Sequence, residues 1–161
     1  MVYVPQKNKK KYVTLLLYGF ILLLVFLILA DLHIIKSTLC HFLFFFEAVF
    51  YTFILTKFIL PTYTYIIDDN RFRVIKTMGN KTLTECDVDI TNILEIFPYK
   101  QHKKQVNKKA KCIYNYNANF LSSTCQCLIF EYSGICEAIL FEPNKKMLDI
   151  ISRVKKGLSS V

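Results

Sequence analysis

Six cysteines are the residues of this 161-residue chain best able to do chemistry: Cys40, Cys86, Cys112, Cys125, Cys127 and Cys136. Structural zinc sites draw their thiolates from spacings such as Cys-x2-Cys, and no such pair occurs here. Cys125 and Cys127 lie two residues apart in a β-rich run, so both side chains point to one face of a strand. We therefore expect buried, inert thiols, with a metal site and a redox-active thiol as the alternatives.

No other group of residues indicates catalysis. A glycine-rich loop that could hold a phosphate is not possible with the four glycines present, which are Gly19, Gly79, Gly134 and Gly157. The acidic pairs Asp68–Asp69 and Asp87–Asp89 stand where turns and caps are expected. The sequence thus predicts no catalytic residue, no metal ligand and no cofactor, and a thiol or metal enzyme is only an alternative.

A lysine-rich segment, residues 100–111, carries a candidate binding patch of six lysines: Lys100, Lys103, Lys104, Lys108, Lys109 and Lys111. Val106 and Ala110 are its only apolar residues, so we expect a solvated loop or a frayed helix that adds little to a core. The functional interpretation is a basic surface for a protein partner or an anionic membrane leaflet, where each lysine contributes about 1 kcal/mol. Nucleic acid is not an expected partner, because no aromatic platform accompanies the charge.

The elements that must position these residues begin with two apolar runs, 12–30 and 39–60. The first has no charge over nineteen residues, which make a helix of about 28 Å, close to the thickness of a bilayer core. The connection of eight residues between the runs allows only a tight return, so we expect an antiparallel transmembrane hairpin over 12–60. A cleaved signal peptide is the alternative, although its apolar core would be shorter.

The distribution of lysine and arginine predicts the orientation of this hairpin. The basic N-terminus, residues 1–11, holds four lysines, and Arg71, Arg73 and Lys76 follow the second run. Because basic flanks stay in the cytoplasm, we expect a multi-pass protein of the cell membrane with both termini cytoplasmic. Cytoplasmic thiols seldom form structural disulfides, which favours the inert interpretation of the cysteines.

Glu47 is an acid inside the second apolar run, and such residues are often functional. Antiparallel pairing of the two helices brings Tyr18 within about a turn of it, and Tyr51 follows it on its own helix. We therefore expect Glu47 to be protonated, to hydrogen-bond to Tyr18 or Tyr51, or to contact another subunit. The last interpretation predicts a small membrane assembly subunit that acts through its helices.

Residues 62–161 read as a separate cytoplasmic β-domain. Short β-rich runs separated by turn residues predict six or seven strands, at 63–67, 71–78, 82–86, 93–97, 112–116, 124–132 and 135–142. A final helix is expected over 143–156, with Pro143 in its first turn, Gly157 as its C-terminal cap and an apolar stripe that includes Met147 and Ile151. The fold class predicted is a membrane helical hairpin plus a small antiparallel β-sandwich or barrel closed by an amphipathic helix.

This outline resembles the bacterial pleckstrin-homology-like (bPH) membrane proteins over residues 12–156. The resemblance is carried by the hairpin leading into 63–78, the turn and strand over 87–93, and the run 139–143 that leads into the last helix. It implies a PH-like domain with a non-catalytic binding or scaffolding role, and it identifies no ligand. We expect a membrane-anchored interaction protein whose partners are the lipid bilayer, anionic head groups, a protein or a second copy of itself.

Overall fold

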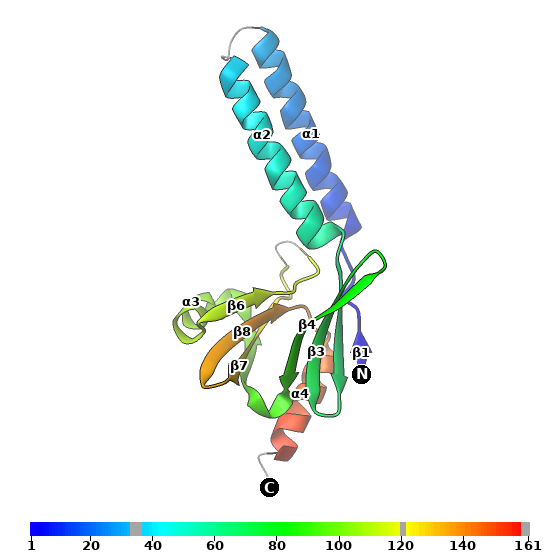
Figure 1. Cartoon of the computed structure of the whole chain (residues 1–161), viewed down its shortest axis with the longest axis vertical. Coiled ribbons are helices and arrows are strands. Elements are labelled where there is room, and N and C mark those ends of the chain that lie inside the picture. The colour runs from blue at the N-terminus through cyan, green and yellow to red at the C-terminus, as the bar shows by residue number, and fades with distance from the viewer. Residues whose placement is uncertain (33–36, 120–121, 159–161) are drawn as a thin grey trace. The chain divides into compact units, whose positions relative to one another are not determined.

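The computed structural model describes the chain except for residues 33–36, 120–121 and 159–161 (Figure 1). The chain divides into two compact units, one made of Met1–Gln6 with Pro61–Val161 and one made of Lys7–Leu60. We call them the β-domain and the hairpin. The first six residues therefore belong with the β-domain, whereas the sequence had placed them in a basic segment of residues 1–11.

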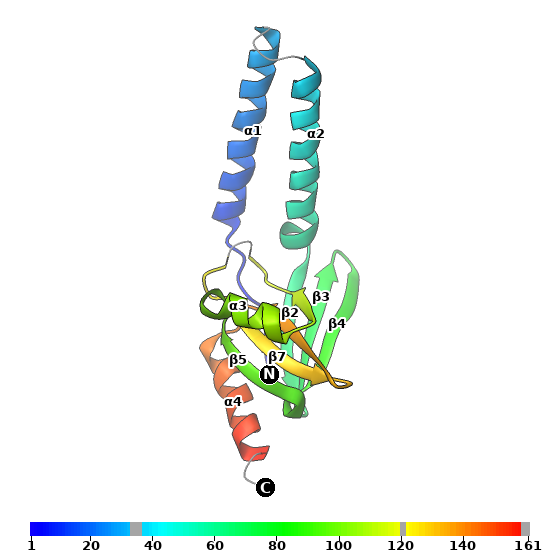
Figure 2. The same ribbon diagram turned by 90° about the vertical axis from the view of Figure 1, so that its left-hand side faces the viewer.

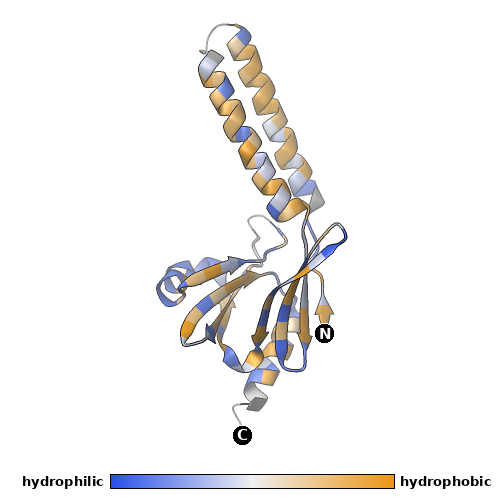
Figure 3. Cartoon of the chain, in the orientation of Figure 1, coloured by the Kyte–Doolittle hydropathy of each residue, from blue (hydrophilic) through white to orange (hydrophobic). Residues whose placement is uncertain are grey.

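The hairpin consists of helix α1 (Lys9–Asp31), helix α2 (Ser37–Ile54) and a π-helical extension, η1 (Leu55–Ile59). Asn8 caps α1, because its side-chain oxygen accepts a hydrogen bond from the backbone N–H of Lys11 at 3.1 Å. By length and composition both helices can cross a membrane, and only 6% and 11% of their apolar windows are buried. In Figure 3 most of the visible residues of both helices are apolar, as expected where lipid is the solvent.

The two helices of the hairpin approach closely at Gly19. A Cβ atom at this position would lie 1.0 Å from the hydroxyl oxygen of Tyr51, so the ring of Tyr51 occupies the space that glycine leaves. The Tyr51 hydroxyl lies 3.5 Å from the backbone oxygen of Leu15, to which it donates. Small residues often permit such close helix contacts in membranes.

The first sheet of the β-domain is antiparallel and has the order β1-β2-β3-β4. Its strands are β1 (Val2–Tyr3), β2 (Thr62–Asp68), β3 (Arg71–Met78) and β4 (Lys81–Asp89). The sequence predicted the last three and missed β1, which is too short to show a period. It pairs with β2 so that Tyr3 stands opposite Tyr65.

The second sheet has the order β5-β7-β8-β6 and is mixed. It follows a 3-10 turn, η2 (Ile90–Asn92), and contains β5 (Ile93–Pro98), β6 (Cys112–Asn115), β7 (Gln126–Tyr132) and β8 (Ile135–Phe141). β6 runs parallel to β8, so the expectation of an entirely antiparallel domain is wrong at this strand. Helix α3 (Tyr99–Lys109) connects β5 to β6. It returns the chain across the sheet, so that β6 begins at the end of the sheet where β8 also begins.

The main core of the β-domain lies between the two sheets and helix α4 (Lys145–Leu158). Tyr65, Phe72 and Phe141 are fully buried at its centre, and Met147 and Ile151 of α4 complete it. The expected apolar stripe of this helix is therefore confirmed. Its ends differ from expectation: Asn144 is the cap, with its side-chain oxygen accepting from the N–H of Met147 at 2.8 Å, and Gly157 lies inside the helix.

A second apolar cluster lies on the other face of the second sheet, beneath α3 (Figure 2). The alternating residues of β7 and β8 that point away from the main core supply it, together with Cys125 and Val106. Both faces of these two strands are therefore covered. The domain is thus a small mixed-sheet domain with a C-terminal helix, and its two sheets do not close into a barrel.

Candidate functional site

The lysine-rich segment forms most of α3, a helix whose one fully buried residue is Val106. Val106 lies in the second cluster and Ala110 packs against it, so the segment adds only a little to a core, as expected. The helix is interrupted at His102, whose φ of −120° is not helical and whose ring packs against Phe97 with the centroids 4.9 Å apart. One buried valine among polar neighbours gives too weak a pattern to be recognised in the sequence.

The six lysines are exposed and most of them have no acidic neighbour. Lys109 is the exception, because its ammonium group lies 2.8 and 3.0 Å from the two carboxylate oxygens of Glu95. Across the described part of the chain, no carboxylate forms an ion pair with the other five, which are Lys100, Lys103, Lys104, Lys108 and Lys111. These five lysines, which we call the basic face, carry positive charge that no carboxylate among the described residues of the β-domain neutralises by an ion pair.

The spacing of the basic face has an energetic cost. Lys104 and Lys108 are four residues apart in the part of α3 that follows the break at His102, so they share one side of the helix and repel each other. Each such like-charged pair destabilises a helix by about 0.2–0.5 kcal/mol. An external anion along this side would remove the repulsion.

The cysteines occupy three environments. Cys40, Cys125 and Cys127 are buried, Cys86 and Cys136 are half-buried, and Cys112 is exposed, so burial was the wrong expectation for Cys112. Burial raises the pKa of both Cys86 and Cys127 to about 12, which keeps these thiols protonated and poorly nucleophilic near neutral pH. Within the residues that the structure describes, no three His, Cys, Asp or Glu side chains converge on a possible metal site.

A buried polar network around Glu142 was not predicted from the sequence. Glu142 follows β8 and is only 5% exposed, and its carboxylate accepts hydrogen bonds from the backbone N–H of Asn119 at 2.9 Å and from the side-chain amide of Asn119 at 2.7 Å. The same amide donates to the backbone oxygen of Gln6 at 3.0 Å, which ties the N-terminal segment to this loop. Since each hydrogen bond to a charged group contributes roughly 1.5–3 kcal/mol, this network is a structural feature of the domain.

Tyr65 extends this network into the core. Its hydroxyl donates to the backbone oxygen of Tyr116 at 2.8 Å and accepts from the backbone N–H of Glu142 at 3.2 Å. Burial raises the pKa of Tyr65 far above its ordinary value, so it stays a neutral donor. Asn117, in the same loop, donates to the Cys125 sulfur at 3.3 Å.

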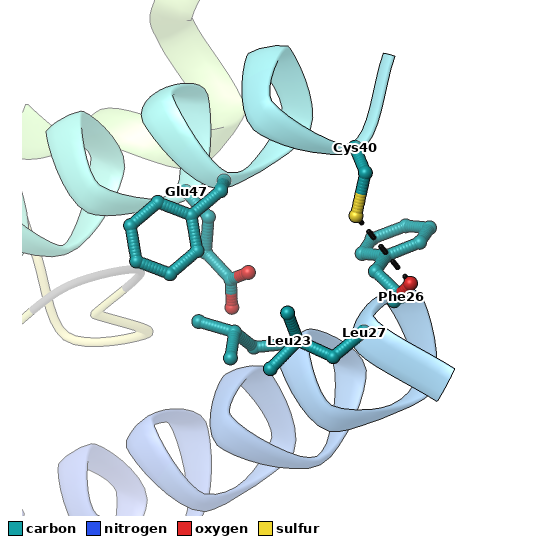
Figure 4. Close-up of a pocket in the computed structure, with 6 residues that line it drawn as sticks. Leu23, Phe26, Leu27, Cys40 and Glu47 are labelled. Atoms are coloured by element: carbon teal, nitrogen blue, oxygen red, sulfur yellow. Dashed lines mark hydrogen bonds between the residues drawn. The ribbon is translucent and has the colours of Figure 1, made fainter. Parts of the chain in front are cut away.

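Glu47 has a different environment, inside the hairpin. Both carboxylate oxygens are inaccessible and neither has a hydrogen-bond partner, so the expected bond to Tyr18 or Tyr51 is absent. Tyr18 is 68% exposed, and the Tyr51 hydroxyl is directed to Leu15 instead. The residues around Glu47 are Leu23, Phe26, Leu27, Cys40 and Phe44, and Figure 4 shows the carboxylate directed toward the leucines of α1.

A larger crevice between α1 and α2 adjoins this carboxylate. It has a volume of about 290 Å³, and its lining residues are Leu27, Ala30, Cys40, His41 and Phe44. Three of these also surround Glu47, so the crevice and the carboxylate belong to one continuous region of the hairpin. The sequence located Glu47, but only the packing of the helices produces the crevice.

Comparison with known proteins supplies no relative: no family model matches the chain, and no curated protein or solved structure matches it either. The functional assignment therefore depends on two features of this chain, the basic face of α3 and the carboxylate of Glu47.

Proposed function

We propose that this chain is a membrane-anchored, non-catalytic interaction protein whose PH-like β-domain binds the anionic inner leaflet through the basic face of α3. The observation that carries the proposal is the set of five exposed lysines without an ion-pair partner among the described residues, four of them on α3 and Lys111 two residues after its end, with Val106 buried beneath the helix. A protein partner with an acidic surface is the alternative occupant of the same face.

The pairing of β1 with β2 supports a cytoplasmic position for both termini. The hairpin leaves the β-domain after Gln6 and returns to it at Pro61, so both of its ends join one folded unit. That unit must lie on a single side of any membrane that α1 and α2 cross. The lysines at positions 7 and 9–11 favour the cytoplasmic side, because basic flanks resist translocation.

The arrangement of the β-domain supports a PH-like fold. Two four-stranded sheets enclose one core, and the C-terminal helix α4 covers it through Met147 and Ile151. The parallel strand β6 and the short strand β1 depart from the expected outline. Both are additions at sheet edges and leave the central meander of β2, β3 and β4 intact.

The electrostatic contribution of the basic face is sufficient for stable orientation of the domain. At about 1 kcal/mol for each lysine near an anionic surface, five lysines contribute up to about 5 kcal/mol. Because chain connections at Gln6 and Pro61 already keep the domain near the bilayer, this energy orients it and is not needed for recruitment. The attraction decays over the Debye length of about 8 Å at physiological salt.

The test uses the full chain in nanodiscs and a fluorophore on Cys112, an exposed thiol close to the end of α3. Energy transfer from this donor to acceptor-labelled lipid should increase when about a third of the phosphatidylcholine is replaced by phosphatidylserine. The increase should disappear at 1 M salt or when the five lysines of the basic face are replaced by glutamine.

A matched control replaces exposed lysines elsewhere in the domain, Lys81, Lys145 and Lys146, by glutamine. This variant should keep the response to phosphatidylserine. Equal transfer in both lipid compositions would contradict the proposal. Lysine-dependent binding of an acidic protein without any lipid response would replace the leaflet by a protein partner.

A further inference from the structure

We propose that Glu47 and the crevice beside it form a docking site for a transmembrane helix of another protein, one that carries a lysine or arginine at the depth of Glu47. This inference is independent of the function proposed for the β-domain. It depends on the hairpin alone, in which the described residues leave this carboxylate without a donor.

The first step is the cost of an unpaired carboxylate in this place. Aliphatic and aromatic side chains surround it, and the nearest polar group, the Cys40 thiol, donates to the backbone oxygen of Phe26 at 3.4 Å. The space beside the carboxylate is about 10 Å³, room for no more than about one water molecule. Acids at such depth generally pair with another polar or charged group, so we infer that the partner of Glu47 comes from outside this chain's hairpin.

The second step is the shape of the approach. The crevice of about 290 Å³ shares Leu27, Cys40 and Phe44 with the surroundings of Glu47, so a side chain that enters it would contact the residues that enclose the carboxylate. Its lining is apolar except for Cys40 and His41. A lysine or arginine fits this combination, because its long aliphatic stem packs against apolar groups while its cationic end pairs with an acid.

The third step is that a second copy of this chain has no lysine or arginine at this depth. Helix α1 has no charge between residues 12 and 30, and Lys57 is the only lysine or arginine of the second apolar run. Lys57 is ten residues from Glu47, which is about 15 Å along a helix. Two copies inserted in the same direction would therefore place acid beside acid at this depth.

The experiment co-reconstitutes the full chain with synthetic leucine-rich transmembrane peptides and measures binding by energy transfer in vesicles. One peptide has a lysine at mid-span, a second has leucine at that position, and a third has its lysine near one end. We expect the mid-span lysine peptide to bind on the order of tenfold more tightly than the leucine peptide. This preference should be lost with Glu47→Leu and with Glu47→Gln.

Two further variants separate pairing from a structural role of Glu47. The Glu47→Lys variant should no longer bind the lysine peptide and should instead bind a peptide with glutamate at mid-span. A residue with a merely structural role would not reverse the preference in this way. Glu47→Leu combined with Phe46→Glu moves the acid to an exposed neighbouring position, and it should not restore the preference. Circular dichroism of each variant checks that the helices are retained.

Three results would overturn the inference. They are equal binding of the lysine and leucine peptides, an unchanged preference in Glu47→Leu, and Glu47-dependent self-association of the chain without any peptide. None of them bears on the basic face of α3, so the two proposals can fail separately.

Discussion

Glu142 and Glu47 are two carboxylates shielded from solvent, one in each unit of this molecule, and their surroundings differ completely. Glu142 accepts two hydrogen bonds from Asn119. Glu47 accepts none and is enclosed by leucine, phenylalanine and cysteine side chains. The difference arises from the elements that surround each residue, because the loop beside Glu142 presents amide donors, whereas the part of helix α1 beside Glu47 uses its backbone N–H groups within its own hydrogen-bond ladder.

This comparison distinguishes an acid that stabilises its own fold from an acid that is free to pair with a group of another molecule. A satisfied buried carboxylate stabilises its own fold, and its removal leaves donors without acceptors. An unsatisfied carboxylate costs stability in the isolated chain and is useful only when a partner arrives. Substitutions at the two positions should therefore change the free energy of unfolding in opposite directions.

The largest effect is expected for Glu142→Leu. It removes the two carboxylate oxygens that accept from the backbone and side-chain amides of Asn119, so we expect a loss of roughly 3–4 kcal/mol in the free energy of unfolding of the β-domain. Chemical denaturation of the full chain in detergent, followed by circular dichroism, measures it. The matched variant is Glu131→Leu, on the exposed end of β7, which should change stability by less than about 0.5 kcal/mol. A similar loss in both variants would show that the network contributes nothing specific.

A substitution in the hairpin tests whether its packing is as well defined as that of the β-domain. Gly19→Ala places a Cβ atom on the Tyr51 hydroxyl, and we expect a loss of roughly 1–3 kcal/mol in hairpin stability. Thermal melting of α1 and α2 in micelles is the measurement. Adding Tyr51→Ala should recover most of the loss. Without recovery, the contact between Gly19 and Tyr51 would not be the cause.

The opposite sign is expected for Glu47→Leu. Removing an unpaired acid from a membrane-spanning helix should raise the stability of the hairpin by on the order of 2 kcal/mol. Amide exchange of α2 in micelles reports this change. A decrease in protection would mean that Glu47 already has a partner within the hairpin, and it would remove the basis of the docking site.

The smallest effect concerns the thiols of the β-domain. The folded-state pKa of Cys127 is raised by burial from its ordinary value of 9.0 to about 12, so its contribution to stability is full below pH 9 and is lost as the pH rises toward 12. Cys127→Ala should therefore flatten the fall in stability between pH 9 and pH 11, relative to the unsubstituted chain. Cys112→Ala is the control, because this exposed residue should leave the pH profile unchanged. Identical profiles for all three proteins would show that Cys127 ionises equally easily in the folded and unfolded states.

Most elements of the β-domain could be predicted because their patterns are local. The turn after β2 has Asp69 and Asn70 at positive φ, and the turn after β7 has Ser133 and Gly134 at positive φ; aspartate, asparagine and glycine are the residue types that most readily adopt this conformation. These turns set the pairing of β2 with β3 and of β7 with β8. Strand β1 and the parallel pairing of β6 were not predictable, because both depend on segments far apart in the chain.

The candidate sites likewise have some features that the sequence predicts and others that depend on tertiary packing. Charge and hydropathy follow from residue type, so the sequence alone was sufficient to find the apolar hairpin, the six lysines and the acid at position 47. It could not show that Val106 holds α3 against the sheet or that Asn119 satisfies Glu142, because such contacts join residues brought together only by packing. The tertiary structure also decided that Tyr18 and Tyr51 leave Glu47 unpaired, since the rotation of each helix about its axis determines which side chains meet.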